Sequence, residues 1–256
     1  MELVYHNTVR SIRSGHRDAV FAILASILQT LVMVLVFFFF MDFMGMRQAA
    51  VRGDFLLYVM SGIFVFMVHI KAVAAVSGAE GPTSPMMQHA PMNTTISIWA
   101  SAFSALYVQV IALLAILGAY HLLWKPLEIY DPIGALAMIL LAWFSGCAIG
   151  AVFLAVKPWA PRSVGIVQQI YVRLNMFASG KMFLANLMTP KMLMVFSWNP
   201  LFHVIDQGRG EVFLNYNPMK SELAYPIIVS VVLLVIGLIG ESYTRKRVSV
   251  SWSAGH

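Results

Sequence analysis

Long apolar stretches, each bounded by charged or turn-forming residues, dominate the chain. The clearest extends from Ala19 to Met41 without a charged residue and includes four consecutive phenylalanines. A helix needs about 20 such residues to cross the ~30 Å hydrocarbon core of a bilayer. The pattern predicts six spans, which are Ala19–Met41, Phe55–Val76, Ile96–Leu123, Ile133–Val156, Val164–Leu184 and Leu223–Gly240.

The first apolar stretch is predicted to be a retained anchor helix rather than a cleaved signal peptide. It is longer than the apolar region of an ordinary signal peptide, which has about 7–15 residues. No small-residue cleavage site follows it, because the chain continues Asp42-Phe43-Met44.

Composition supports the membrane prediction. Apolar residues make up 60% of the 256 residues and charged residues only 11%, against about 25% charged in soluble domains. These values exclude a water-soluble globule and a disordered chain, and the single cysteine, Cys147, excludes an internal disulfide scaffold. We therefore expect an all-α integral membrane protein with one transmembrane domain over residues 1–256.

Basic residues near the first and last spans predict the orientation. Six of them flank these two spans, namely Arg10, Arg13, Arg17, Arg245, Lys246 and Arg247. Cytoplasmic segments carry an excess of Lys and Arg, and an even number of spans places both termini on one side. We expect a multi-pass protein with both termini in the cytoplasm.

Two cytoplasmic segments have distinctive patterns. Before the first span, Arg10, Arg13 and Arg17 line one helical stripe beside an apolar face. This is typical of an amphipathic helix in the membrane interface, although a simple basic flank has the same charges. The loop Ser77–Thr95 lacks Lys and Arg and contains methionines and prolines that suit either a docking surface or a plain turn.

Three cations lie within the predicted spans, where an unpaired charge is costly. Lys71 is in the second span, and Arg173 and Lys181 are two turns apart in the fifth, about 12 Å along an intact helix. No Asp or Glu lies in these spans to pair with them. They could form a path for a polyanion, or Lys71 and Lys181 could extend to the interface.

Aromatic residues recur every four positions along the third span, at Trp99, Phe103 and Tyr107. Sugar rings stack on such faces, so the stripe could follow a glycan path. Packing against lipid or against other helices produces the same spacing.

Motifs for chemistry are missing from the sequence. The histidines form no metal-ligating pair, no G-x-x-x-x-G-K-[ST] phosphate loop occurs, and no carboxylates are paired within a span. We therefore predict no metal site, no cofactor and no catalytic residue in this chain, and no nucleic acid partner.

Residues Asn199–Arg209 read Asn-Pro-Leu-Phe-His-Val-Ile-Asp-Gln-Gly-Arg. This segment resembles the N-P-L-x-H-x-[IV]-[DE]-x-x-R stretch before the last span of type-2 ABC exporter permeases. The most similar group is the capsular polysaccharide export permeases, followed by the O-antigen permeases. The resemblance extends in layout to Phe55–Ile63, to Met86–Met92 before the third span, and to a short outer re-entrant region before the last span.

The resemblance implies a homodimer of six-span subunits paired with two separate ATP-binding cassette subunits, which would bind ATP and Mg. The amino-terminal helix and the Ser77–Thr95 loop would contact that ATPase, with Glu80, Met86, Met87 and Pro91 as coupling residues. A periplasmic adaptor and an outer-membrane export protein would be further partners. The substrate would be a capsular, acidic, lipid-linked polysaccharide crossing the bacterial inner membrane.

The motif itself is expected to fix an outer helix. Asn199 suits an N-cap and Pro200 a first helical position. His203, Asp206 and Arg209 follow one turn apart, so local ion pairs are geometrically available.

Three other functions stay open at this point. The chain could be a type-2 permease for O-antigen, another lipid or a drug. It could be an intramembrane enzyme acting on lipid-linked sugars, or a passive channel or assembly subunit without an ATPase.

Overall fold

The computed structural model describes residues 19–45, 54–79 and 94–253. These residues form α-helices and one short 3-10 helix, and no strand occurs among them. Five helices are long and apolar enough to cross a membrane: α2 (Ala19–Phe43), α3 (Phe55–Ser77), α5 (Thr94–Leu123), α6 (Pro132–Val156) and α10 (Ala224–Ser253). The protein is therefore all-α and has the character of a multi-pass membrane protein.

Shorter elements lie between α6 and α10. They are α7 (Pro161–Ala178), the 3-10 helix η2 (Ala185–Leu187), α8 (Pro190–Phe196) and α9 (Pro200–Val212). Helix α7 is not among the five long apolar helices, because its Arg, Gln and Asn residues lower its mean hydropathy.

The first four predicted spans agree with α2, α3, α5 and α6 to within a few residues. The fifth is wrong in its last part, because α7 ends at Ala178 and not at Leu184. Gly180 adopts a φ of 69°, which a right-handed helix cannot contain. The last helix extends beyond the predicted Gly240 to Ser253.

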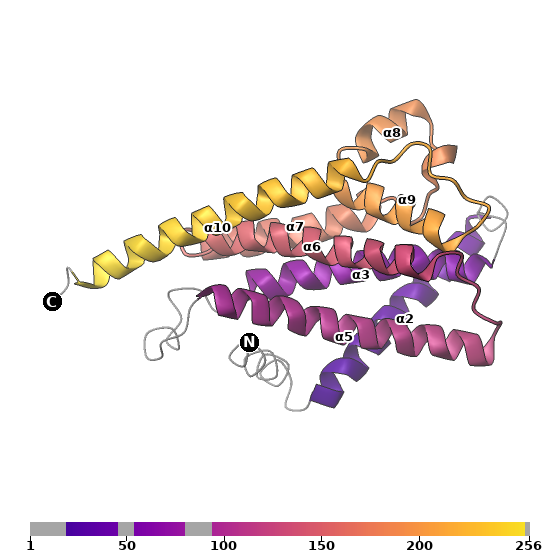
Figure 1. The fold of residues 1–256 in the computed structure, drawn as a ribbon, viewed down its shortest axis with the longest axis horizontal. Helices are drawn as coiled ribbons and strands as arrows, with labels where there is room; N and C mark the ends of the chain where they lie inside the picture. The colour runs from indigo at the N-terminus through magenta and orange to yellow at the C-terminus, as the bar shows by residue number, and fades with distance from the viewer. Residues whose placement is uncertain (1–18, 46–53, 80–93, 254–256) are drawn as a thin grey trace.

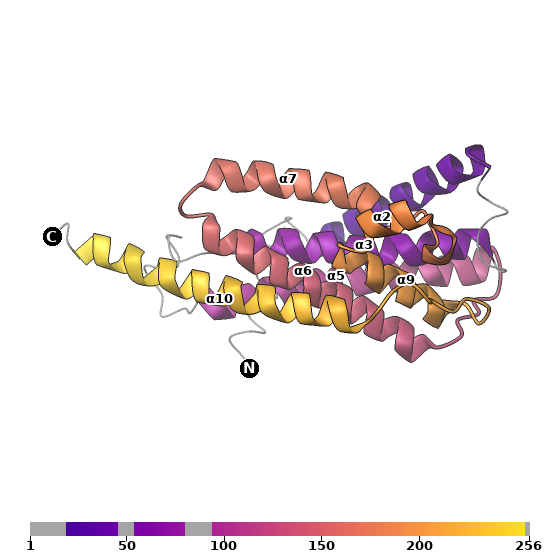
Figure 2. The ribbon, with the colours of Figure 1, turned by 90° about the horizontal axis from the view of Figure 1, so that it is seen from above.

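Helices α2, α3, α5 and α6 alternate in direction, α7 runs back, and α10 then runs in the same direction as α6, so that together they form an elongated bundle (Figures 1 and 2). We call its two ends the Ser77 end, where α3, α6 and α10 finish, and the Asp54 end, where α3 and α6 begin. Helix α3 runs through the middle and is the most buried of the long helices. Helix α2 crosses the bundle at an angle and exposes apolar side chains such as Leu24, Leu28 and Phe39.

Small residues on α6 allow close packing at the centre. A Cβ atom at Gly146 would lie 2.5 Å from the carbonyl oxygen of His69 on α3, and one at Gly150 would lie 2.8 Å from the Cβ of Val76. On another face of α6, a Cβ at Gly237 of α10 would meet Ala151 at 2.8 Å. Small residues are common at helix contacts in membranes because association there depends on close packing. Helix α6 is thus packed closely between α3 and α10.

Candidate functional site

Helix α9 begins at an asparagine that also holds the end of α7. The side chain of Asn199 accepts a hydrogen bond from the backbone N–H of Leu201 at 3.0 Å, and Pro200 occupies the first turn. The amide nitrogen of Asn199 donates to Asn175 Oδ1 at 2.8 Å and to the carbonyl oxygen of Ala178 at 3.0 Å. The predicted N-cap is confirmed, and it joins α9 to α7.

Asp206 lies about two turns further along α9 and is buried. Its carboxylate accepts hydrogen bonds from the Tyr216 hydroxyl at 2.5 Å, the Ser221 hydroxyl at 2.7 Å and the backbone N–H of Ala185 at 3.3 Å. Burial, together with the neighbouring carboxylate, raises the pKa of the Tyr216 phenol above its ordinary value. The phenol therefore stays protonated as a donor, and Asp206 connects α9 to segments on both sides of it.

Arg209 is one turn beyond Asp206 and is 1% exposed. Its guanidinium donates to the carbonyl oxygens of Phe183 at 2.5 Å and Gly180 at 3.3 Å, and also to that of Lys181. The same group lies over the ring of Tyr58, with Cζ 4.3 Å from the ring centroid. Hydrogen bonds from a charged donor are among the strongest in proteins.

Asp206 and Arg209 together hold both ends of residues 180–185, which we call the 180–185 loop. Arg209 binds carbonyl oxygens at its start, and Asp206 binds the N–H of Ala185 at its end. We call this arrangement the α9 clamp. A backbone turn buried in a membrane protein requires such partners, because its polar groups cannot be left unpaired in hydrocarbon.

The predicted local ion pairs along α9 are wrong. Within the described part of the chain, Asp206 and Arg209 bind other segments instead of one another. His203 likewise contacts Ser197 and Glu222: its Nε2 lies 2.9 Å from the Ser197 carbonyl oxygen, and its Nδ1 accepts from the Glu222 N–H at 3.0 Å. A helical spacing permits a pair but does not reveal competing partners brought by the fold.

Lys181 lies in the 180–185 loop and is 2% exposed. Its Nζ lies 3.5 Å from the ring centroid of Phe66 on α3 and 4.5 Å from that of Phe37 on α2. Among the described residues, no hydrogen-bond partner reaches this nitrogen. The two ring faces are the groups that stabilise the cation, through their quadrupoles.

Arg173 and Lys181, which were predicted to share the fifth span, do not lie on one intact helix. Lys181 follows the end of α7, so its predicted 12 Å separation from Arg173 along an intact helix does not apply. Arg173 is exposed on the surface of α7. Lys71 donates to Gln29 Oε1 of α2 at 2.6 Å, so it has a polar partner that the sequence pattern did not reveal.

The aromatic stripe on α5 continues onto α6. Trp99 and Phe103 stack with ring centroids 5.7 Å apart, and Phe103 lies 5.4 Å from the ring of Trp143. Tyr107 continues the stripe and is 53% exposed. The sequence did not predict Trp143, because it lies on a different helix.

A buried polar chain that the sequence analysis did not detect joins α3, α6 and α7. The Ser145 hydroxyl donates to the Ala142 carbonyl oxygen at 2.9 Å and lies 2.9 Å from His69 Nδ1. The proton on Nδ1 is therefore donated to Ser145, which leaves His69 Nε2 to accept the Tyr171 hydroxyl at 2.7 Å. These hydrogen bonds fix the middle of α7 to the centre of the bundle.

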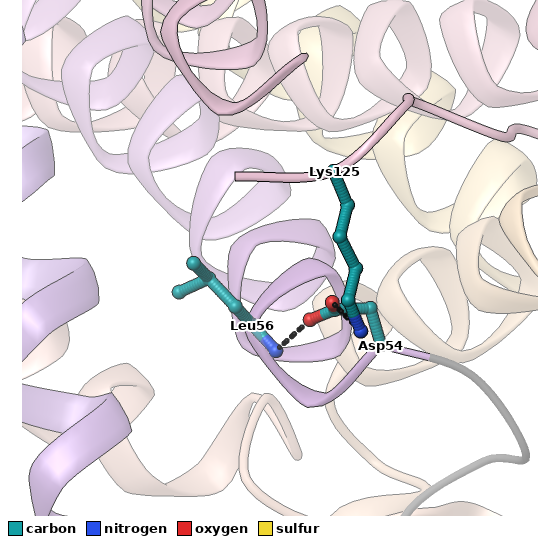
Figure 3. Close-up of polar contacts among 3 residues, drawn as sticks. All are labelled: Asp54, Leu56 and Lys125. Atoms are coloured by element: carbon teal, nitrogen blue, oxygen red, sulfur yellow. Dashed lines mark hydrogen bonds and ion pairs between the residues drawn. The ribbon is translucent and has the colours of Figure 1, made fainter. Parts of the chain in front are cut away.

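At the Asp54 end, Asp54 caps α3 and pairs with a residue beyond α5 (Figure 3). Its carboxylate accepts from the Leu56 N–H at 2.8 Å and lies 3.2 Å from Lys125 Nζ. Burial alone would raise the pKa of Asp54, but these contacts outweigh it and the pKa lies below its usual value. The charge stabilises the start of α3, since the N-terminus of a helix favours an anion.

The predicted coupling residues Glu80, Met86, Met87 and Pro91 lie outside the described residues, as does the predicted amino-terminal helix. Among the residues that the structure describes, no group of three or more His, Cys, Asp or Glu side chains could hold a metal ion. No protein-family model matches the chain, and no curated protein does. The function must therefore be argued from the geometry and the sequence motif.

Proposed function

We propose that this chain is the membrane-spanning subunit of an ATP-driven exporter of the type-2 ABC class, which moves a capsular polysaccharide across the bacterial inner membrane. One observation carries the proposal. The Asn199–Arg209 segment that resembles these permeases forms α9, and its Asn, Asp and Arg side chains hold the turn that follows α7. A motif with this arrangement suits a fixed outer region of a transporter.

In this proposal α7 is the fifth of six spans. Its 18 residues give a length of about 27 Å, close to the hydrocarbon thickness of a bilayer. Its outward stripe is apolar, with Ile166, Ile170 and Leu174 at least half exposed. The chain from η2 to α9 would then be the outer re-entrant region, and both termini would lie in the cytoplasm beyond the Ser77 end.

The proposed substrate path uses cations and aromatic rings. Arg173 is an exposed cation on α7, and the stripe of Trp99, Phe103 and Tyr107 offers stacking surfaces. An acidic, lipid-linked glycan has the negative charge and the sugar faces that these groups would bind. Lys71 and Lys181 would contribute to the path only after leaving Gln29 and the two phenylalanine rings.

ATP hydrolysis is assigned to a separate ATPase subunit, and the functional unit would be two permeases with two ATPases. The test is purification of the tagged chain from its host in mild detergent, followed by mass spectrometry of what remains bound. The expected result is a Walker-motif ATPase at equal stoichiometry. Recovery of the folded chain without an ATPase would overturn the proposal and favour a channel, an assembly subunit or an enzyme.

A pair of matched variants sharpens this test. Met86→Glu combined with Met87→Glu places charge in the proposed coupling loop and should abolish recovery of the ATPase. Met219→Glu changes an exposed methionine (74% exposed) near the other end of the protein and should leave recovery unchanged. Equal losses in both would show that the coupling loop is not the docking surface.

A further inference from the structure

An open groove lies between α6, α7, α8 and α10. Its volume is about 420 Å³, which is within the range of about 300–1,000 Å³ typical of small-ligand sites. Most of its lining is aliphatic or aromatic, including Ile149 and Val152 of α6 and Val229 and Leu233 of α10. Both of these helices are long and apolar enough to cross a membrane, so two walls of the groove belong to candidate membrane spans.

The two polar side chains of α7 in the groove are already satisfied within the protein. The Tyr171 hydroxyl donates to His69 Nε2 at 2.7 Å. The Asn175 side chain accepts from Asn199 and donates to the Tyr171 carbonyl oxygen at 3.0 Å. Because these groups are engaged internally, the groove favours an apolar occupant over water.

One end of the groove has features that suit a lipid headgroup. Trp198 lies between α8 and α9, lines the groove and is 79% exposed. Its carbonyl oxygen accepts a hydrogen bond at 2.9 Å from the hydroxyl of Tyr225, in the first turn of α10. Tryptophan is enriched where the bilayer meets water. Lys191 is exposed on α8 one turn before Val195, which lines the groove. Residues four apart share a helix face, so this cation lies beside the same end.

We propose that this groove binds a phospholipid of the surrounding bilayer, with an acyl chain between α7 and α10 and the phosphate beside Lys191. The apolar lining of the groove suits a hydrocarbon chain. The exposed cation and the interfacial tryptophan at one end suit an anionic headgroup. The groove is lined by none of Arg173, Trp99, Phe103 and Tyr107, which form the proposed glycan path, and it does not depend on the transport proposal.

The test is native mass spectrometry of the full chain in detergent with added palmitoyl-oleoyl-phosphatidylglycerol. Leu233→Trp fills the groove, whereas Val235→Trp adds the same ring to the outward face of α10, where Val235 is 49% exposed. We expect the wild type and Val235→Trp to retain one lipid per chain, and Leu233→Trp to retain at least about fivefold less. Val229→Trp provides a second groove-filling variant if Leu233→Trp does not fold.

The headgroup contact is tested separately. Lys191→Gln should weaken retention of phosphatidylglycerol about fivefold, the amount expected for one basic residue near anionic lipid. Equal retention by Leu233→Trp and Val235→Trp would overturn the proposal. So would a photo-cross-linker at position 233 that joins two copies of the chain instead of lipid, because a second copy would then occupy the groove.

Discussion

The α9 clamp makes a quantitative prediction for Arg209→Met. The substitution keeps a long apolar side chain but removes the donors to the carbonyl oxygens of Gly180, Lys181 and Phe183. Each hydrogen bond from a charged donor contributes about 1.5–3 kcal/mol. The substitution also removes a buried charge whose Nε has no hydrogen-bond partner in the described part of the chain, and this offsets part of the loss. We expect a net destabilisation of about 3–5 kcal/mol.

The protein contains its own reporter for this measurement. Cys147 is the single cysteine and is buried, so a thiol-reactive fluorescent dye labels the chain only as it unfolds. For a protein of this size, 1 kcal/mol corresponds to a shift of about 2–4 °C in the melting midpoint. Arg209→Met should therefore melt roughly 6–20 °C below the wild type.

Arg173→Met is the matched control, because Arg173 is exposed on α7. A surface substitution of this kind changes stability by about 0.5 kcal/mol or less. The melting midpoint of Arg209→Lys should lie between those of Arg209→Met and Arg173→Met. An ammonium retains the charge but cannot reach three carbonyl oxygens as the planar guanidinium does. If Arg209→Met melted within about 2 °C of Arg173→Met, the clamp would not be a source of stability and the reasoning would be wrong.

Three further predictions use the same assay or an export assay. Gly180→Ala should destabilise by about 1–3 kcal/mol, because φ is 69° and the new Cβ would lie 2.5 Å from Phe202 Cδ2. The control Gly165→Ala, with open space around it, should be neutral or slightly stabilising. Asp54 has a lowered pKa, so its stabilisation is complete above its unfolded pKa of about 4 and is lost as pH falls through the folded pKa. Asp54→Asn should flatten the fall in melting midpoint below about pH 4, and an unchanged acid profile would contradict this. On the proposed function, Arg173→Gln should impair export of acidic glycan while assembly and ATP binding continue, and normal export would exclude Arg173 from the path.

The long apolar helices were predictable from sequence because each is fixed mainly by its own composition. In hydrocarbon every backbone polar group must be satisfied within a helix, so twenty apolar residues leave few alternatives. The N-cap at Asn199 was predictable for the same reason, since the side chain acts on its own helix.

What the sequence could not predict depends on contacts between segments. The end of α7 is set by Gly180, whose positive φ is compatible with the loop because Arg209, far along the chain, binds the carbonyl oxygens there. Tyr216 and Ser221 both donate hydrogen bonds to the Asp206 carboxylate, and no helical spacing reveals these partners. The bond from Tyr171 to His69 likewise joins residues that only the folded bundle brings together.

The way α7 is attached to the bundle has a mechanical consequence. Pairs of side chains hold the middle and the end of this helix: Ser77 donates to Gln168, Tyr171 donates to His69, and Asn199 donates to Asn175. Hydrogen bonds between helices in a bilayer contribute about 0.6 kcal/mol each on average, so these three oppose displacement of α7 by about 2 kcal/mol. A free energy of that size keeps a displaced arrangement at a few per cent of molecules. A small force at the Ser77 end could therefore tilt α7 relative to the rest of the bundle. Helices α3, α6 and α10 would keep their relative positions, because their glycines allow close contacts between them.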